Sequence, residues 1–223
     1  MSSKQLPPPL PPETRTVGQV VAEAIRLYGR GVRAALPLGL PVAAADAAAV
    51  GSSIAEKILI LLVCAPAFTL AFAWASALAA GVRPRAATWV RALALGTLVF
   101  LPAALFFPWF ALLSVAWLAL VGLTVPVVMI ENASWRTAVR RAVELCRADY
   151  LHALGSLAAL VIVFVLTRIL LAFLLREQAD NAIRVAVFLA DLVVSPLLFL
   201  GAALLYFDQA ARVGSRSRAE RRR

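Results

Sequence analysis

Residues 92–130 read ALALGTLVFLPAALFFPWFALLSVAWLALVGLTVPVVMI, a run of 39 residues without a charged side chain. One membrane-crossing helix needs roughly 20 apolar residues, so this run is too long for one span and right for two. A break is expected at Phe107-Pro108-Trp109, because proline ends a helix and tryptophan favours the membrane interface. The run therefore predicts two consecutive transmembrane helices.

The composition of the whole chain agrees with this stretch. Of 223 residues, 62% are hydrophobic and 15% are charged, whereas soluble domains have about 45–50% apolar and about 25% charged residues. A chain with so few polar groups cannot cover a water-facing surface, and it leaves no room for a large soluble catalytic domain. The composition predicts a protein embedded in a bilayer.

Other apolar runs bring the predicted number of spans to six. Besides the two spans within 92–130, they cover residues 34–55, 58–80, 151–175 and 184–207. Alanines spaced four residues apart in the second run, such as Ala73 and Ala77, let helices approach closely. The expected fold class is all-α, a polytopic integral membrane bundle of six transmembrane helices with two cytoplasmic amphipathic helices.

The two amphipathic helices are expected at Thr16–Arg30 and Asn132–Tyr150, where apolar residues repeat at helical spacing opposite a charged face. Thr16 and Gln19 have the spacing of a capping box. A shift of 118 residues aligns the two segments, for example Thr16 with Ser134. Two readings of this match stay open: a duplicated unit, or the chance similarity of two amphipathic helices.

Three regions follow from these runs: a disordered proline-rich tail over 1–13, a single helical membrane domain over 14–207, and a basic C-terminal tail over 208–223. The first residues lack the charged-then-apolar order of a cleaved signal peptide. Insertion is therefore expected to depend on the internal spans.

The basic residues predict the orientation. Eighteen of the 22 Lys and Arg fall on the side that holds both termini, three fall on the other side, and Arg168 lies within a span. This asymmetry places both termini in the cytoplasm. Arginines between apolar runs do not form the basic face that nucleic acid requires. They are expected to attract anionic lipid headgroups, or to reflect ordinary positive-inside topology alone.

Asp46, Arg168 and Asp191 are the ionisable residues set well inside predicted spans. Counting residues at about 1.5 Å each puts all three roughly 10 to 14 Å below the outer surface. Charges at that depth need a partner or water, so the three could pair. The favoured interpretation is a buried ion pair that orients three helices. The alternative is a polar site for an ion, a proton or a lipid headgroup.

The other candidate residues are expected to have structural roles. Asn132 is expected to cap the second amphipathic helix, and Glu131 to bond nearby backbone or an arginine. His152 is the only histidine and begins a span, without a Ser, Cys and Asp set that would make a catalytic triad. Cys64 and Cys146 are expected in different compartments, which excludes a disulfide. The sequence predicts no catalytic residue, cofactor or metal.

Two stretches resemble one known family. They are TVGQVVAEAIRLY at 16–28 and PVVMIEN at 126–132, the latter running into AVRRAVEL at 138–145. The pattern resembles the membrane domain of bacterial glycerophosphodiester phosphodiesterases and of related stand-alone membrane proteins. Its motif residues here are Pro126, Glu131, Asn132, Arg140 and Arg141. Family members often have serine where this chain has Ala142, and the soluble catalytic barrel is absent, so the resemblance does not imply that activity.

We therefore expect a non-enzymatic multi-pass protein of the bacterial plasma membrane. It would bind lipid or a partner protein through its surface helices. The alternative is a transporter of a small solute or ion that uses Asp46, Arg168 and Asp191 as a polar site at one depth in the membrane.

Overall fold

The computed structural model describes residues 15–220, with side chains up to residue 215. Residues 1–14 and 221–223 lie outside the described part, and with them the predicted tail over 1–13. The elements in chain order are α1 (Val17–Arg30), α2 (Val32–Ala35), the 3₁₀ helix η2 (Leu36–Gly39), α3 (Leu40–Ala49), α4 (Ile54–Ala80), α5 (Ala86–Phe106), α6 (Ala111–Val121), α7 (Thr124–Glu131), α8 (Trp135–Ala148), α9 (Tyr150–Leu174) and α10 (Asp180–Glu220).

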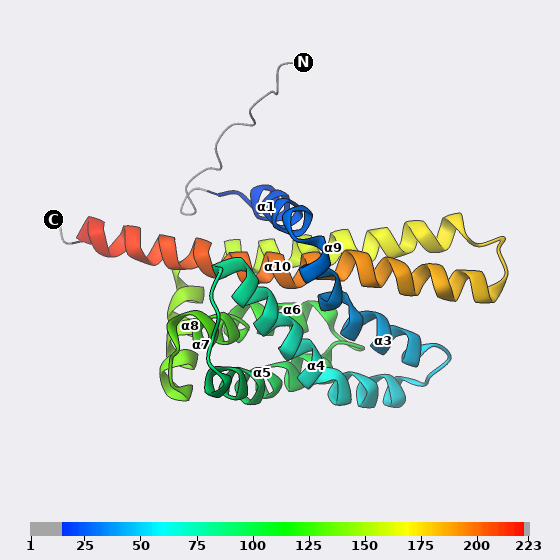
Figure 1. Cartoon of the computed structure of the whole chain (residues 1–223), viewed down its shortest axis with the longest axis horizontal. Helices are drawn as coiled ribbons and strands as arrows, with labels where there is room; N and C mark the ends of the chain where they lie inside the picture. The colour runs from blue at the N-terminus through cyan, green and yellow to red at the C-terminus, as the bar shows by residue number, and fades with distance from the viewer. Residues whose placement is uncertain (1–14, 221–223) are drawn as a thin grey trace, which may run out of the picture.

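The described residues form an all-α bundle without strands, as the composition predicts. Within them, six helical segments are long and apolar enough to cross a membrane. The segments are Val32–Ala49, Ile54–Ala80, Ala86–Phe106, Ala111–Glu131, Tyr150–Leu174 and Asp180–Ser215. The chain is therefore a multi-pass helical membrane protein. Below, the end of the bundle at the α3–α4 turn is called the α3–α4 end, and the opposite end the α7–α8 end (Figure 1).

The first span is shorter than predicted and is built from three pieces. It covers Val32–Ala49 instead of 34–55, and η2 separates α2 from α3. The chain then turns at Gly51, whose φ of 76° favours glycine. Ser53 starts α4 early because its hydroxyl accepts a hydrogen bond from the backbone N–H of Glu56 and the Glu56 carboxylate accepts one from the backbone N–H of Ser53.

The uncharged run at 92–130 breaks where the proline and tryptophan predict, between α5 and α6. The fourth span has a second break, between α6 and α7, that the sequence analysis did not predict. Pro126 lies in the first turn of α7 and has no N–H to donate to the carbonyl of Gly122. That carbonyl instead accepts a hydrogen bond from the N–H of Val125.

Helix α10 continues past the predicted end of the sixth span at 207. It has 41 residues, which corresponds to about 60 Å of helix, twice the roughly 30 Å of a bilayer's hydrocarbon core. The residues that follow 207 pack against other helices: Asp208 and Gln209 are fully buried. Figure 1 shows α10 running the length of the molecule beside the antiparallel α9.

The two amphipathic helices have the same length and boundaries 118 residues apart. Each has 14 residues, with Thr16 and Ser134 at the N-cap positions. The Gln19 side chain accepts a hydrogen bond from the N–H of Thr16. The buried Val20 and Ala24 of α1 also correspond to the buried Ala138 and Ala142 of α8. The two helices therefore share their length, their N-cap position and the positions of two buried residues.

Small residues allow the closest helix contacts. Ala73, Ala75 and Ala77 of α4 are buried, and α4 packs along α5. A Cβ added at Gly39 would lie 2.1 Å from the carbonyl oxygen of Leu192. Backbone-to-backbone approach of this kind holds η2 against α10 and fixes the position of α3 beside α9 and α10.

Candidate functional site

Three ionisable side chains from three helices meet towards the α3–α4 end. The Arg168 Nη2 atom of α9 lies 2.5 Å from Asp46 Oδ2 of α3, and Arg168 Nε lies 3.6 Å from Asp191 Oδ1 of α10. One guanidinium therefore lies between two carboxylates. Asp191 is fully buried, while the side chains of Asp46 and Arg168 keep 27% and 33% of their exposure.

Asp46 lies closer to the end of its helix than the sequence analysis predicts. The sequence analysis put Asp46 nine residues from the end of its span, but α3 ends at Ala49, three residues after Asp46. The distance along the helix is therefore about 4.5 Å instead of about 14 Å. Arg168 lies one to two turns from the end of α9 at Leu174. Asp46 thus lies in the last turn of the short α3, whereas Asp191 lies several turns after the start of α10 at Asp180.

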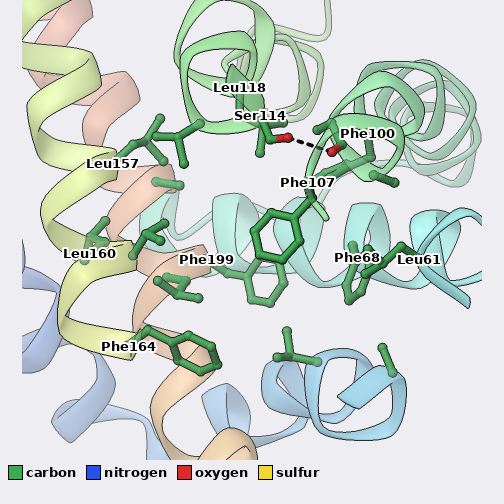
Figure 2. Close-up of a pocket in the computed structure, with 18 of the residues that line it drawn as sticks. Leu61, Phe68, Phe100, Phe107, Ser114, Leu118, Leu157, Leu160, Phe164 and Phe199 are labelled. Atoms are coloured by element: carbon green, nitrogen blue, oxygen red, sulfur yellow. Dashed lines mark hydrogen bonds between the residues drawn. The ribbon is translucent and has the colours of Figure 1, made fainter. Parts of the chain in front are cut away.

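A cavity of about 800 Å³ lies between α3, α4, α5, α6, α9 and α10, directly beside these charges. Its wall is mostly aliphatic and aromatic. Figure 2 shows the rings of Phe68, Phe107 and Phe164 around the same space, and these residues come from α4, the end of α5 and α9. The volume falls within the roughly 300–1,000 Å³ of small-molecule pockets.

The charged groups of the cavity gather towards one end. Asp46, Lys57 and Arg168 belong to its lining; Lys57 lies in the first turn of α4 and Asp46 in the last turn of α3. The Ser114 hydroxyl also faces the cavity, but it donates to the carbonyl of Ala103 at 2.8 Å. The cavity is thus apolar along its walls and charged at the α3–α4 end.

A second ionic cluster lies near the α7–α8 end. The Asp208 carboxylate, fully buried on α10, lies 3.3 Å from Arg15 Nη1 and 3.6 Å from His152 Nε2. Arg212, one turn further on α10, contacts Asp149 Oδ2 at 2.8 Å and donates to the carbonyl of Arg15 at 3.0 Å. The cluster ties Arg15, two residues before the start of α1, to the start of α9 and to α10.

Sequence reasoning did not identify Asp208 or Asp149, and it placed His152 at the start of a span without naming a partner for it. The available signal was that Asp208 is an acidic residue at the start of a segment interpreted as a basic tail. Asp149 also caps α9, because its side chain accepts a hydrogen bond from the N–H of His152. Asp208 and His152 are far apart in the chain, so only the packing of α9 on α10 reveals their contact.

The motif residues at the end of the fourth span make two sets of contacts. Glu131 Oε1 accepts a 2.7 Å hydrogen bond from the Tyr206 hydroxyl and lies 3.5 Å from Arg141 Nε. Partial burial disfavours the charge of Arg141, but Glu144 and Glu131 outweigh this effect and raise the pKa of its guanidinium. Glu131 therefore joins α7, α8 and α10, whereas Arg140 is exposed and lies outside this contact.

Asn132 does not cap α8, contrary to the expectation; Ser134 is the N-cap residue. Asn132 instead ends α7 in the left-handed conformation, with φ of 53°, which Asn tolerates better than most residues. Its side-chain oxygen accepts hydrogen bonds from Thr88 Oγ1 at 2.8 Å and Arg91 Nη2 at 2.7 Å. Asn132 thus fixes the start of α5 against the turn before α8.

The apolar faces of both amphipathic helices are used within the bundle. Helix α1 packs its buried face on α9 and α10, and α8 packs on α6, α7 and α10. Some large side chains stay exposed, among them Ile25 and Trp135. A lipid or partner that bound these helices would therefore meet mixed surfaces rather than a free apolar stripe.

The described residues contain no group of three or more His, Cys, Asp or Glu side chains placed to hold a metal ion. Cys64 and Cys146 are both free thiols. Comparisons with known families, with curated proteins and with solved structures find no match for this chain. The functional argument therefore depends on the cavity and on the two ionic clusters.

Proposed function

We propose that this chain is a non-enzymatic membrane protein that binds a lipid molecule, with the acyl chains in the cavity. The observation that carries the proposal is the cavity itself: about 800 Å³, walled by apolar side chains and charged at one end. Such a distribution matches an amphiphile, because hydrocarbon gains from leaving polar surroundings while a headgroup needs charged or polar partners.

Lateral entry from the bilayer supports the same proposal. Val165 and Ile169 of α9 belong to the lining of the cavity, yet they keep 43% and 59% of their exposure. In a membrane, exposed apolar side chains of a spanning helix face lipid tails. A lipid could therefore slide from the bilayer into the cavity beside α9 without passing through the packed core.

The orientation and the location are part of the proposal. The arginine asymmetry of the sequence supports cytoplasmic termini, which would make the α3–α4 end the outer end of the bundle in a bacterial plasma membrane. Arginines at the other end would add attraction for anionic headgroups of the inner leaflet. The resemblance of residues 126–145 to the membrane domain of glycerophosphodiester phosphodiesterases stays a prediction, as does a protein partner.

Photolabelling with a lipid that carries a diazirine in its acyl chain tests the proposal. Leu118 of α6 lines the cavity, so Leu118→Trp should fill part of it and lower both labelling of the wall and lipid copurification, measured by native mass spectrometry. Leu112→Trp is the matched control, because Leu112 lies on the same helix, is 79% exposed and does not line the cavity. Labelling of the wall that Leu118→Trp leaves unchanged would contradict the proposal.

A second candidate function is the transport of an ion or small solute past the Asp46, Arg168 and Asp191 group. The observation that favours it is Asp191, whose two carboxylate oxygens are buried without a hydrogen-bond partner. Liposome flux separates the two functions. Flux that is lost in Asp46→Asn while the bound lipid is retained would support transport and argue against a purely lipid-binding role.

A further inference from the structure

Two carboxylates beside the cavity depend on a single guanidinium for their ion pairs. Among the residues that the structure describes, Arg168 is the one cation within 4 Å of Asp46 and Asp191, and these two carboxylates share it. Lys57 lines the same cavity but makes no ion pair with either carboxylate in the described part of the chain. With all groups ionised, the three-residue group Asp46, Arg168 and Asp191 carries one uncompensated negative charge.

The second carboxylate is also poorly hydrogen-bonded. Both oxygens of Asp191 are buried without a donor, and its nearest cation, Arg168 Nε, is 3.6 Å away. The Arg168 guanidinium instead makes its close contact with Asp46. A buried carboxylate without hydrogen-bond donors is costly in a medium of low dielectric constant, and the cost falls when a second cation takes over one of the two carboxylates.

We infer that the lipid bound in the cavity has a primary ammonium in its headgroup, as phosphatidylethanolamine does. This inference rests on the proposed lipid binding. The ammonium would pair with Asp46, which is partly exposed and lines the cavity. Arg168 could then turn its donors to Asp191. The phosphate of the same headgroup carries the opposite charge and would face Lys57.

The number of N–H donors and the net charge distinguish an ethanolamine headgroup from choline and glycerol headgroups. A primary ammonium has three N–H donors for carboxylate oxygens, and charge-assisted hydrogen bonds of this kind are the strong ones. A trimethylammonium has the same charge but no N–H donor. A glycerol headgroup on a phosphate is anionic overall and would add a negative charge next to Asp46 and Asp191. The expected order of binding is ethanolamine, then choline, then glycerol.

Competition in nanodiscs tests this order with the full chain. Equal amounts of phosphatidylethanolamine, phosphatidylcholine and phosphatidylglycerol with identical acyl chains are supplied, and the lipids retained by the protein are counted by native mass spectrometry. We expect ethanolamine lipid to exceed each of the others by about tenfold or more, since a hydrogen bond to a charged group is worth roughly 1.5–3 kcal/mol and about 1.4 kcal/mol corresponds to tenfold in affinity.

Two variants test which side chains cause the preference for ethanolamine lipid. Asp46→Asn should bring the ratio of ethanolamine to choline lipid close to one, because it removes the carboxylate that pairs with the ammonium. Lys57→Gln should weaken all three lipids and leave that ratio unchanged, because all three carry the phosphate. An Asp46→Asn protein that keeps the wild-type ratio would overturn the inference.

If a variant does not fold, the competition of the three lipids for the wild-type protein still tests the inference by itself. Equal binding of the three lipids, or a preference for glycerol or choline lipid, would overturn the ammonium assignment and leave lipid binding intact; a proton shared by Asp46 and Asp191 would then balance the charge. If no lipid is retained and cavity labelling is absent, the proposed function itself is wrong.

Discussion

At the scale of single residues, Gly39 is the position with the least room. A Cβ there would lie 2.1 Å from the Leu192 carbonyl oxygen and 2.8 Å from the Leu192 Cα. These are backbone atoms of α10, so they cannot move aside as the end of a side chain could. Gly39→Ala should lower the free energy of unfolding by about 1–3 kcal/mol or more, measured as a lower Tm in detergent.

The control for this substitution is Gly29 in α1. A Cβ at Gly29 meets nothing within 4 Å, so Gly29→Ala should leave the Tm unchanged or raise it, because alanine favours helix by about 1 kcal/mol over glycine. If both substitutions left the Tm unchanged, the close approach of η2 and α10 would be wrong.

Tyr206 is a second residue with a testable contact. Its hydroxyl donates to the Glu131 carboxylate at 2.7 Å, and a hydrogen bond to a charged group contributes about 1.5–3 kcal/mol. Tyr206→Phe should therefore lower the free energy of unfolding by that amount in a denaturant titration. Tyr150→Phe serves for comparison and should cost less, because that hydroxyl donates at 3.3 Å to the neutral carbonyl of Ala116.

At the scale of elements, the ionic cluster around Asp208 holds α1 on the bundle. Asp208→Leu would leave Arg15 and His152 without their shared carboxylate, and breaking a buried ion pair costs roughly 3–5 kcal/mol. We expect faster hydrogen exchange in α1, measured by mass spectrometry, together with a lower Tm.

Asp208→Asn keeps the shape of the side chain and one acceptor, so its effect should be smaller than that of Asp208→Leu. The exchange of α5 gives an internal reference, because α5 makes its contacts with α4, α6 and α7. Equal acceleration in α1 and α5 would mean that the cluster stabilises the whole bundle rather than the attachment of α1.

At the scale of the whole molecule, the predicted orientation can be tested by labelling. In a chain with Cys64→Ser and Cys146→Ala, a membrane-impermeant maleimide should label Glu177→Cys from outside intact cells and should not label Arg83→Cys. Both positions are exposed. Glu177 belongs to the turn between α9 and α10 and Arg83 to the turn between α4 and α5, and these two turns lie at opposite ends of the bundle (Figure 1). The reverse pattern would reject the charge-based orientation.

In the natural chain, burial raises the pKa of the Cys146 thiol, so this thiol should react slowly with the maleimide.

The sequence by itself determined that the chain is an all-α bundle with six spans, and it located the break at Phe107-Pro108-Trp109. These features depend on the composition of a continuous segment, because lipid solvates each apolar stretch largely independently of the others. The amphipathic helices also followed from local spacing, down to the correspondence of Thr16 and Ser134.

The sequence also predicted that Asp46, Arg168 and Asp191 could pair, as they do, but only the tertiary structure decided the geometry of this pairing and which other polar groups meet. Arg168 was expected to face Asp46 and Asp191, but the early turn at Gly51 moved Asp46 close to the end of its helix. The sequence could mark Asp208 as an unusual acidic residue, but it could not reveal the contact of Asp208 with His152. It also could not reveal which residues line the cavity. The physical reason is that such contacts depend on the rotation and tilt of whole helices, which are set by packing between distant segments rather than by local composition.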